Sequence, residues 1–137
     1  MENDFFFKFY CDVDSKYSII IEANGIVLYA YLLEEEEIVS DVWLYNFNQV
    51  PRKTKWDSVD DLPFENISHL IKPLSEQVVF RQFHEDDIKW VFKNSLLDRV
   101  EIIKDEIIFC QMQPNKAPGY SCNALQSGAL ARVELIN

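Results

Sequence analysis

The chain has 137 residues, of which 48% are hydrophobic and 14% aromatic, with three glycines and five prolines. A chain of this length buries one full core, and its apolar content offsets the entropy lost on ordering, so we expect a single globular domain over residues 1–137 rather than a disordered protein. The formal charge of −10 disfavours nucleic acid and anionic membranes as partners and favours a basic protein.

The acidic residues are concentrated near the start of the chain. Residues 1–48 hold ten acids and two bases, a charge of −8, whereas residues 49–137 carry −2. The opening MENDFFFKFYCDVD has no basic leader typical of a signal peptide, and no apolar run approaches the roughly 20 residues of a membrane helix. Cys11, Cys110 and Cys122 form no C-x-x-C pair, so we expect three free thiols in a reducing cytoplasm.

The first elements in chain order are predicted strands. Residues 4–13 alternate between two sets of side chains, Phe5, Phe7 and Phe9 against Phe6, Lys8 and Tyr10. Residues 17–33 predict a hairpin with the two-residue loop Asn24-Gly25. That loop pairs Ala23 with Ile26, Ile21 with Leu28, Ile19 with Ala30 and Tyr17 with Leu32, an apolar surface that we assign to the core. The opposite surface, with Ile20, Glu22, Tyr29 and Tyr31, is mixed and is either half-covered or meets a partner.

Residues 34–37 are four glutamates, which we expect to form the turn into a strand at residues 38–45. Alternation there sets Ile38, Val42 and Leu44 on one side, and Val39, Asp41, Trp43 and Tyr45 on the other. Residues 49–61 indicate a long loop, and residues 66–74 a short helix that ends at or before Pro73.

The second half predicts more strands. Residues 85–97 fit either a strand or a helix, and we favour a strand because the surroundings are β-rich. Residues 99–112 indicate two strands joined near residues 104–106, and the tail indicates an irregular Pro-Gly segment and a closing strand near residues 130–135. These elements predict a mainly β fold, an antiparallel β-sandwich or partly open barrel with at most one or two short helices.

No catalytic motif is present. The G-x-S-x-G, Walker, dinucleotide and H-E-x-x-H patterns are missing, and the acids beside His84 match no metal-ligand spacing and indicate a solvated turn. Cys122 lacks a local activating group, Asp60 and Asp61 are neighbours whose side chains usually diverge, and His69 is far from His84. We therefore expect no enzyme, no cofactor and no metal.

The glutamate run has two interpretations. Charge at a turn protects strand edges from pairing with other chains, whereas four adjacent like charges beside aromatic residues are typical of a contact with a basic protein. The second interpretation predicts a partner-binding set: Glu34, Glu35, Glu36, Glu37, Asp41, Trp43 and Tyr45.

Several segments resemble a known family. These are VWLYN at residues 42–46, Trp56 followed by DLPFEN at residues 61–66, and the tail IIFCQMQPNKAPGYSCNALQSGALARVEL at residues 107–135. Together they resemble small acidic β-rich immunity proteins of bacterial polymorphic and contact-dependent growth inhibition toxin systems. The resemblance implies a cytoplasmic inhibitor that binds one cognate toxin domain, often a nuclease with a basic cleft.

The leading hypothesis is therefore a non-enzymatic immunity protein that neutralises a basic toxin. The alternative is a β-sandwich that binds a small ligand or carbohydrate through its aromatic side chains, with Tyr29, Tyr31, Trp43 and Tyr45 as candidates, although aromatic residues at strand spacing are more often core. An enzyme that uses Cys122 or the acids beside His84 is the third hypothesis.

Overall fold

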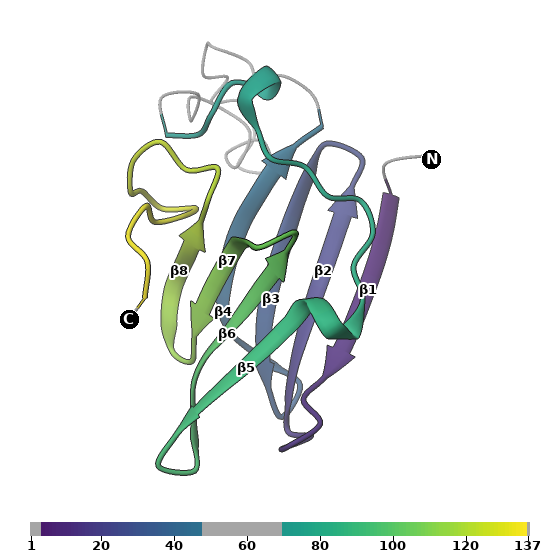
Figure 1. Ribbon diagram of the computed structural model, residues 1–137, viewed down its shortest axis with the longest axis vertical. Helices are drawn as coiled ribbons and strands as arrows, with labels where there is room; N and C mark the ends of the chain where they lie inside the picture. The colour runs from purple at the N-terminus through teal and green to yellow at the C-terminus, as the bar shows by residue number, and fades with distance from the viewer. Residues whose placement is uncertain (1–3, 48–69, 137) are drawn as a thin grey trace.

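Two four-stranded antiparallel sheets pack together in the computed structural model, which describes residues 4–47 and 70–136 (Figure 1). Sheet 1 has the order β1-β2-β3-β4, and sheet 2 has the order β5-β6-β7-β8, so each sheet is a meander of neighbouring strands. The strands are β1 Asp4–Tyr10, β2 Tyr17–Asn24, β3 Val27–Glu34, β4 Glu37–Asn46, β5 Ile88–Lys93, β6 Leu96–Lys104, β7 Ile107–Gln113 and β8 Lys116–Ser121. The predicted mainly β fold is confirmed: the described residues contain no α-helix, only 3-10 turns such as η2 Leu74–Glu76 and η3 Glu85–Asp87.

The core forms where the inner faces of the two sheets meet. Strand alternation turns Phe5, Phe7 and Phe9 inward with the buried Ile19 and Ile21. Ring contacts join the two sheets, with centroids 6.1 Å apart for Tyr45 and Phe109 and 6.3 Å apart for Tyr17 and Phe92. Phe83, in the segment before η3, lies 5.9 Å from Phe7. Each large side chain buried in this way stabilises the fold by about 1.5–3 kcal/mol.

Three hairpins turn through two residues that both have positive φ and are not glycine. The pairs are Glu35-Glu36 (52° and 69°), Asn94-Ser95 (53° and 67°) and Asp105-Glu106 (52° and 67°). Positive φ at both central residues defines the type I′ turn, whose twist matches that of the flanking strands. The predicted turns at residues 34–37 and 104–106 are therefore confirmed, as is the strand favoured within residues 85–97.

The free edge of β4 is closed by later parts of the chain. The Asn115 N–H donates to the Val39 carbonyl at 2.8 Å, and the Trp43 N–H donates to the Leu130 carbonyl at 2.9 Å. The Ser40 hydroxyl donates to the Lys116 carbonyl at 2.7 Å. These bonds join sheet 1 to β8 and to the C-terminal segment.

The C-terminal segment also covers the outer face of sheet 2. Gln111 is 1% exposed, and its side-chain amide accepts a hydrogen bond from the Ile136 N–H at 2.7 Å. The same amide donates to the carboxylate of Glu101, which is 4% exposed and accepts a second bond from Arg99 Nε at 3.0 Å. Buried polar groups on this face are thus satisfied by the chain itself.

The predicted hairpin register is wrong by two residues, although its faces are right. Ala23 pairs with Leu28 and Ile21 with Ala30, because the loop is Gly25-Ile26 and not Asn24-Gly25. Asn24 stays in the strand, where its side-chain oxygen accepts the N–H groups of Ile26 and Val27, and only Gly25 has positive φ (91°). A shift of two residues returns every side chain to its original face.

Two predictions about the tail are wrong. The Pro-Gly segment lies inside β8, where Gly119 allows the backbone to approach the Gln111 carbonyl so closely that a Cβ would collide with it. Residues 130–135 form no strand, because their hydrogen bonds go to two different strands, from Leu130 to β4 and from Arg132 to β8.

The predicted helix at residues 66–74 is not present in its described part. Residues 70–73 are not helical, and η2 begins after Pro73 instead of ending there. The rest of that segment and the predicted loop at residues 49–61 lie outside the described residues.

Candidate protein-binding surface

The outer face of sheet 1 carries aromatic, aliphatic and acidic side chains together. Strand alternation and the observed register place twelve residues on it: Phe6, Lys8, Tyr10, Ser18, Ile20, Glu22, Tyr29, Tyr31, Leu33, Ile38, Asp41 and Trp43. Phe6 is 56% exposed, Tyr10 48% and Ile38 59%. Phe6 and Tyr10 lie on the edge strand β1 and Ile38 lies on the opposite edge strand β4, so the three exposed side chains are separate candidates for contact with a partner.

A pair of stacked tyrosines lies in the middle of this face, between two carboxylates. The rings of Tyr29 and Tyr31 are 5.9 Å apart with an interplanar angle of 20°. Glu22 is the cross-strand neighbour of Tyr29 on β2, and Asp41 is the neighbour of Tyr31 on β4. Burial, followed by the nearby carboxylates, raises the pKa of both phenols, so each hydroxyl stays protonated at neutral pH.

Asp41 is a partly buried carboxylate with no cation beside it among residues 4–47 and 70–136. Among the described residues no side chain or backbone group forms a hydrogen bond or ion pair with it. Burial raises its pKa, because the ionised form has lost water.

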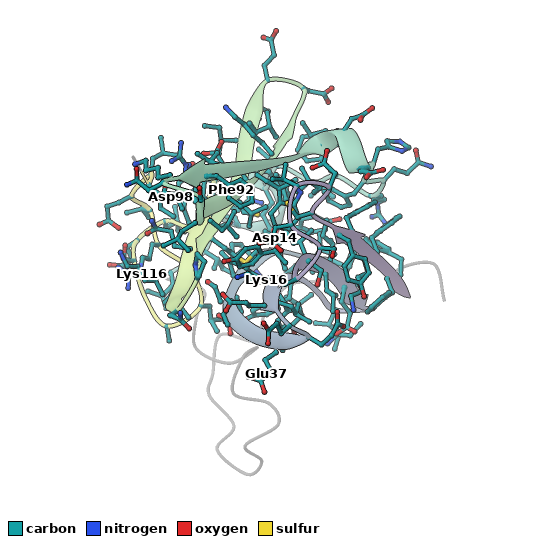
Figure 2. All side chains as sticks on the ribbon, turned by 90° about the horizontal axis from the view of Figure 1, so that it is seen from below. Asp14, Lys16, Glu37, Phe92, Asp98 and Lys116 are labelled. Atoms are coloured by element: carbon teal, nitrogen blue, oxygen red, sulfur yellow. The ribbon has the colours of Figure 1, made fainter. Side chains whose placement is uncertain are left out.

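The four glutamates lie at one end of this face. Glu34 ends β3, Glu37 begins β4, and Glu35, Glu36 and Glu37 are exposed. Figure 2 looks at this end of the molecule and shows the Glu37 side chain pointing away from the ribbon. The run is therefore both a turn and an exposed acidic tip.

Glu36 differs from its neighbours because it is bound within the protein. Its carboxylate accepts from Lys8 Nζ at 2.5 Å and from the Tyr10 hydroxyl at 3.0 Å, and Lys8 lies 4.9 Å from the centre of the Tyr10 ring. The hydrogen bond between them lowers the pKa of Glu36 and raises that of Lys8. Because Glu36 is paired with Lys8, Glu35 and Glu37 are the better candidates for contact with a binding partner.

Trp43 and Tyr45 do not lie at the surface as the predicted binding set requires. Both are 0% exposed. Trp43 Nε1 donates to the Asn46 side chain at 2.7 Å, and the Tyr45 hydroxyl donates to the Phe80 carbonyl at 2.5 Å. A bulge at Leu44 also puts the two rings on opposite faces of β4, so the prediction that they share a face is wrong.

The exposed aromatic residues of this face are Phe6 and Tyr10, which were not in the predicted set. The sequence held a usable signal, because alternation along residues 4–13 already separated them from Phe5, Phe7 and Phe9. Tyr29 and Tyr31 also belong to the mixed hairpin surface that the sequence indicated.

The cysteines give no support to a nucleophile. All three are free thiols, as predicted, with Cys11 and Cys110 buried and Cys122 partly buried. Burial raises the pKa of Cys122 to about 11, so its thiol is protonated at neutral pH and is a weak nucleophile.

The acids beside His84 form a local cap. The His84 N–H donates to the Asp87 carboxylate at 2.8 Å, and Lys104 Nζ lies 3.1 Å from the same carboxylate. Within residues 4–47 and 70–136 no group of three or more His, Cys, Asp or Glu side chains is placed to hold a metal ion. His69, Asp60 and Asp61 lie outside the described residues.

A polar hollow of about 1000 Å³ lies between β8 and the C-terminal segment. Its lining includes Lys116, Tyr120, Ser127, Arg132 and Glu134. Tyr120 is the one aromatic residue in the lining, so the hollow is not the aromatic pocket that carbohydrate binding would require.

Comparison of the chain with protein-family models, with curated proteins and with solved structures found no match. In the part of the chain that the structure describes, no helix has the length and apolar character needed to cross a membrane.

Proposed function

We propose that this chain is a non-enzymatic immunity protein, which binds a cognate toxin with a basic surface and neutralises it in the cytoplasm. The observation that carries the proposal is the outer face of sheet 1, where exposed Phe6, Tyr10 and Ile38 lie among carboxylates. Lys8, the one cation among the described residues of this face, is paired with Glu36. The class of partner, a toxin, comes from the sequence resemblance.

The distribution of charge supports a basic partner. Residues 1–48 carry −8 of the total −10, and β1 to β4 all belong to this part of the chain. Acid gathered on one sheet attracts a positively charged protein and raises the rate of encounter at low ionic strength.

The apolar groups would supply the short-range part of the contact. Aromatic side chains that lose water in a complex contribute most of the binding energy at many interfaces, and surrounding charges set orientation. Phe6 and Tyr10 have the exposure to act in this way, whereas Trp43 and Tyr45 stabilise the fold.

The direct test is co-expression with the product of the neighbouring gene. We expect the two proteins to purify as a complex, and cells that make this chain to survive production of the neighbouring toxin. A neighbouring product that neither binds nor harms cells would overturn the proposal.

A kinetic test separates the acidic tip from a solvated turn. Glu35→Lys with Glu37→Lys should slow association with the purified toxin by roughly tenfold or more at low salt, and the difference should shrink toward 1 M salt, where screening acts over about 3 Å. The matched control is Asp105→Lys with Glu106→Lys, which makes the same charge change at an exposed hairpin end of sheet 2. If both variants slow association equally, or if neither does, the glutamates form only a solvated turn and do not contact the toxin.

The second candidate function is binding of a small polar ligand in the hollow beside β8. Its support is the hollow itself, which is lined by Lys116, Ser127 and Arg132. Slower hydrogen exchange of these residues when a small ligand is added, in a protein that binds no toxin, would favour this function over the first.

A further inference from the structure

We infer that Tyr29, Tyr31 and Asp41 on the outer face of sheet 1 form a subsite for an arginine side chain of the protein partner. The inference rests on the proposed function, since the guanidinium belongs to a residue of the partner. It adds to the proposed function the chemical group that the middle of the face would bind.

The aromatic pair supplies π-electron density with which a cation can interact. Tyr29 and Tyr31 lie 5.9 Å apart at an interplanar angle of 20°, so their ring faces are nearly parallel. A guanidinium is planar and weakly hydrated, and it lies against aromatic faces more readily than an ammonium does.

The carboxylates supply the matching charge on both sides of the pair. Asp41 is directly across from Tyr31 on one flank, and Glu22 is across from Tyr29 on the other. Both carboxylates act electrostatically on the Tyr31 phenol, which places them near the tyrosine pair.

Asp41 is the group that most needs a cation. It is partly buried, has no ion pair or hydrogen bond within residues 4–47 and 70–136, and faces no lysine or arginine across β3. Lys8, the cation in the same cross-strand row, is bound to Glu36. A guanidinium can donate two parallel N–H groups to one carboxylate, which offsets the water that Asp41 has lost.

The face therefore selects for a positive group and against an anionic one. A phosphate or a second acidic chain would meet Glu22 and Asp41 with like charge. A neutral sugar could stack on the tyrosines but would leave Asp41 uncompensated.

The experiment is an NMR titration of the full chain with N-acetyl-L-arginine amide as the probe. We expect saturable shifts of the Tyr29 and Tyr31 ring resonances and of the Asp41 carboxyl carbon. N-acetyl-L-citrulline amide, which has a similar shape without charge, should produce none of them, and N-acetyl-L-lysine amide should bind several-fold more weakly.

Three variants make the titration specific. Asp41→Asn should abolish the shifts, Tyr31→Phe should keep them because the ring remains, and Glu106→Gln on sheet 2 should leave them unchanged. Equal response to citrulline or lysine, or an unchanged response in a folded Asp41→Asn protein, would overturn the inference.

The toxin separates this inference from the proposed function. We expect Asp41→Asn to weaken toxin binding by about tenfold or more. A toxin that binds wild type and Asp41→Asn equally would contradict the arginine subsite alone. A protein that binds the arginine probe but no neighbouring toxin would contradict the immunity function alone.

Discussion

Among single residues, Asp41 shows how a partly buried carboxylate can reduce stability. Its pKa in the folded protein is raised by burial, so between the unfolded pKa of about 3.9 and the higher folded value the native state binds more protons than the unfolded chain. Stability contributed by this group is therefore lost as pH rises through that window. Ionised Asp41 disfavours the fold at neutral pH.

Replacing the carboxylate removes this effect. We expect Asp41→Asn to raise the free energy of unfolding at pH 7 by roughly 0.5 kcal/mol, the usual scale for partly exposed positions. The gain should disappear near pH 3, where wild-type Asp41 is protonated in both states. Urea unfolding of both proteins across pH measures the difference, and a destabilised variant at pH 7 would show that Asp41 has a stabilising contact.

Residue by residue, the sequence predicted the exposure of the acidic side chains better than the facing of the aromatic ones. Glu35, Glu36 and Glu37 are exposed, and Glu34 and Asp41 are partly exposed, because charge resists full burial. Trp43 and Tyr45 could not be placed correctly, since the bulges in β4 at Val39 and Leu44 break the alternation from which their faces were predicted. No residue at either bulge marks it in the sequence.

Among the elements, three hairpins have turn residues that do not match the preference of the turn type. A type I′ turn favours Asn-Gly, since positive φ is costly for a side chain such as glutamate. The strands were predictable because most of them keep the alternation of apolar and polar side chains. The register of the turns was not predictable. Asn24 illustrates the reason: a side chain that accepts two backbone N–H groups moved the loop by one position.

Substituting the preferred residues tests this view of the turns. We expect Asp105→Asn with Glu106→Gly to raise the free energy of unfolding by about 1 kcal/mol, since φ at these residues is 52° and 67°. Glu35→Asn with Glu36→Gly should gain less, because it also removes the contact of Glu36 with Lys8 and Tyr10. Urea unfolding measures both gains. Loss of stability at residues 105 and 106 would mean that those acids have a structural role.

At the scale of the whole molecule, the net charge of −10 opposes the compact state. The fold class was predictable because hydrophobic alternation and turn spacing act along the entire chain. The closure of β4 by the C-terminal segment was not predictable, because it depends on single backbone bonds between Trp43 and Leu130 and between Val39 and Asn115, which leave no periodic pattern.

Salt should reveal the repulsion. We expect the melting temperature to rise by a few degrees as NaCl is raised from about 0.01 M to about 0.5 M, since screening shortens the range of charge repulsion. Glu35→Gln with Glu37→Gln should melt higher than wild type at low salt and gain less from NaCl. An identical melting temperature at every salt concentration would show that the acidic residues are too far apart to repel measurably.

The alternation of side chains along β1 also bears on how such a protein can evolve. Phe6 and Tyr10 face outward, whereas Phe5, Phe7 and Phe9 pack inward, so exposed and core positions are interleaved along one strand. Mutations at the outward positions can change the surface while the core is inherited unchanged. Under the proposed function, diverging lineages would vary at Phe6, Tyr10 and Ile38 and keep their inward neighbours, so that a new toxin could be matched without a new fold.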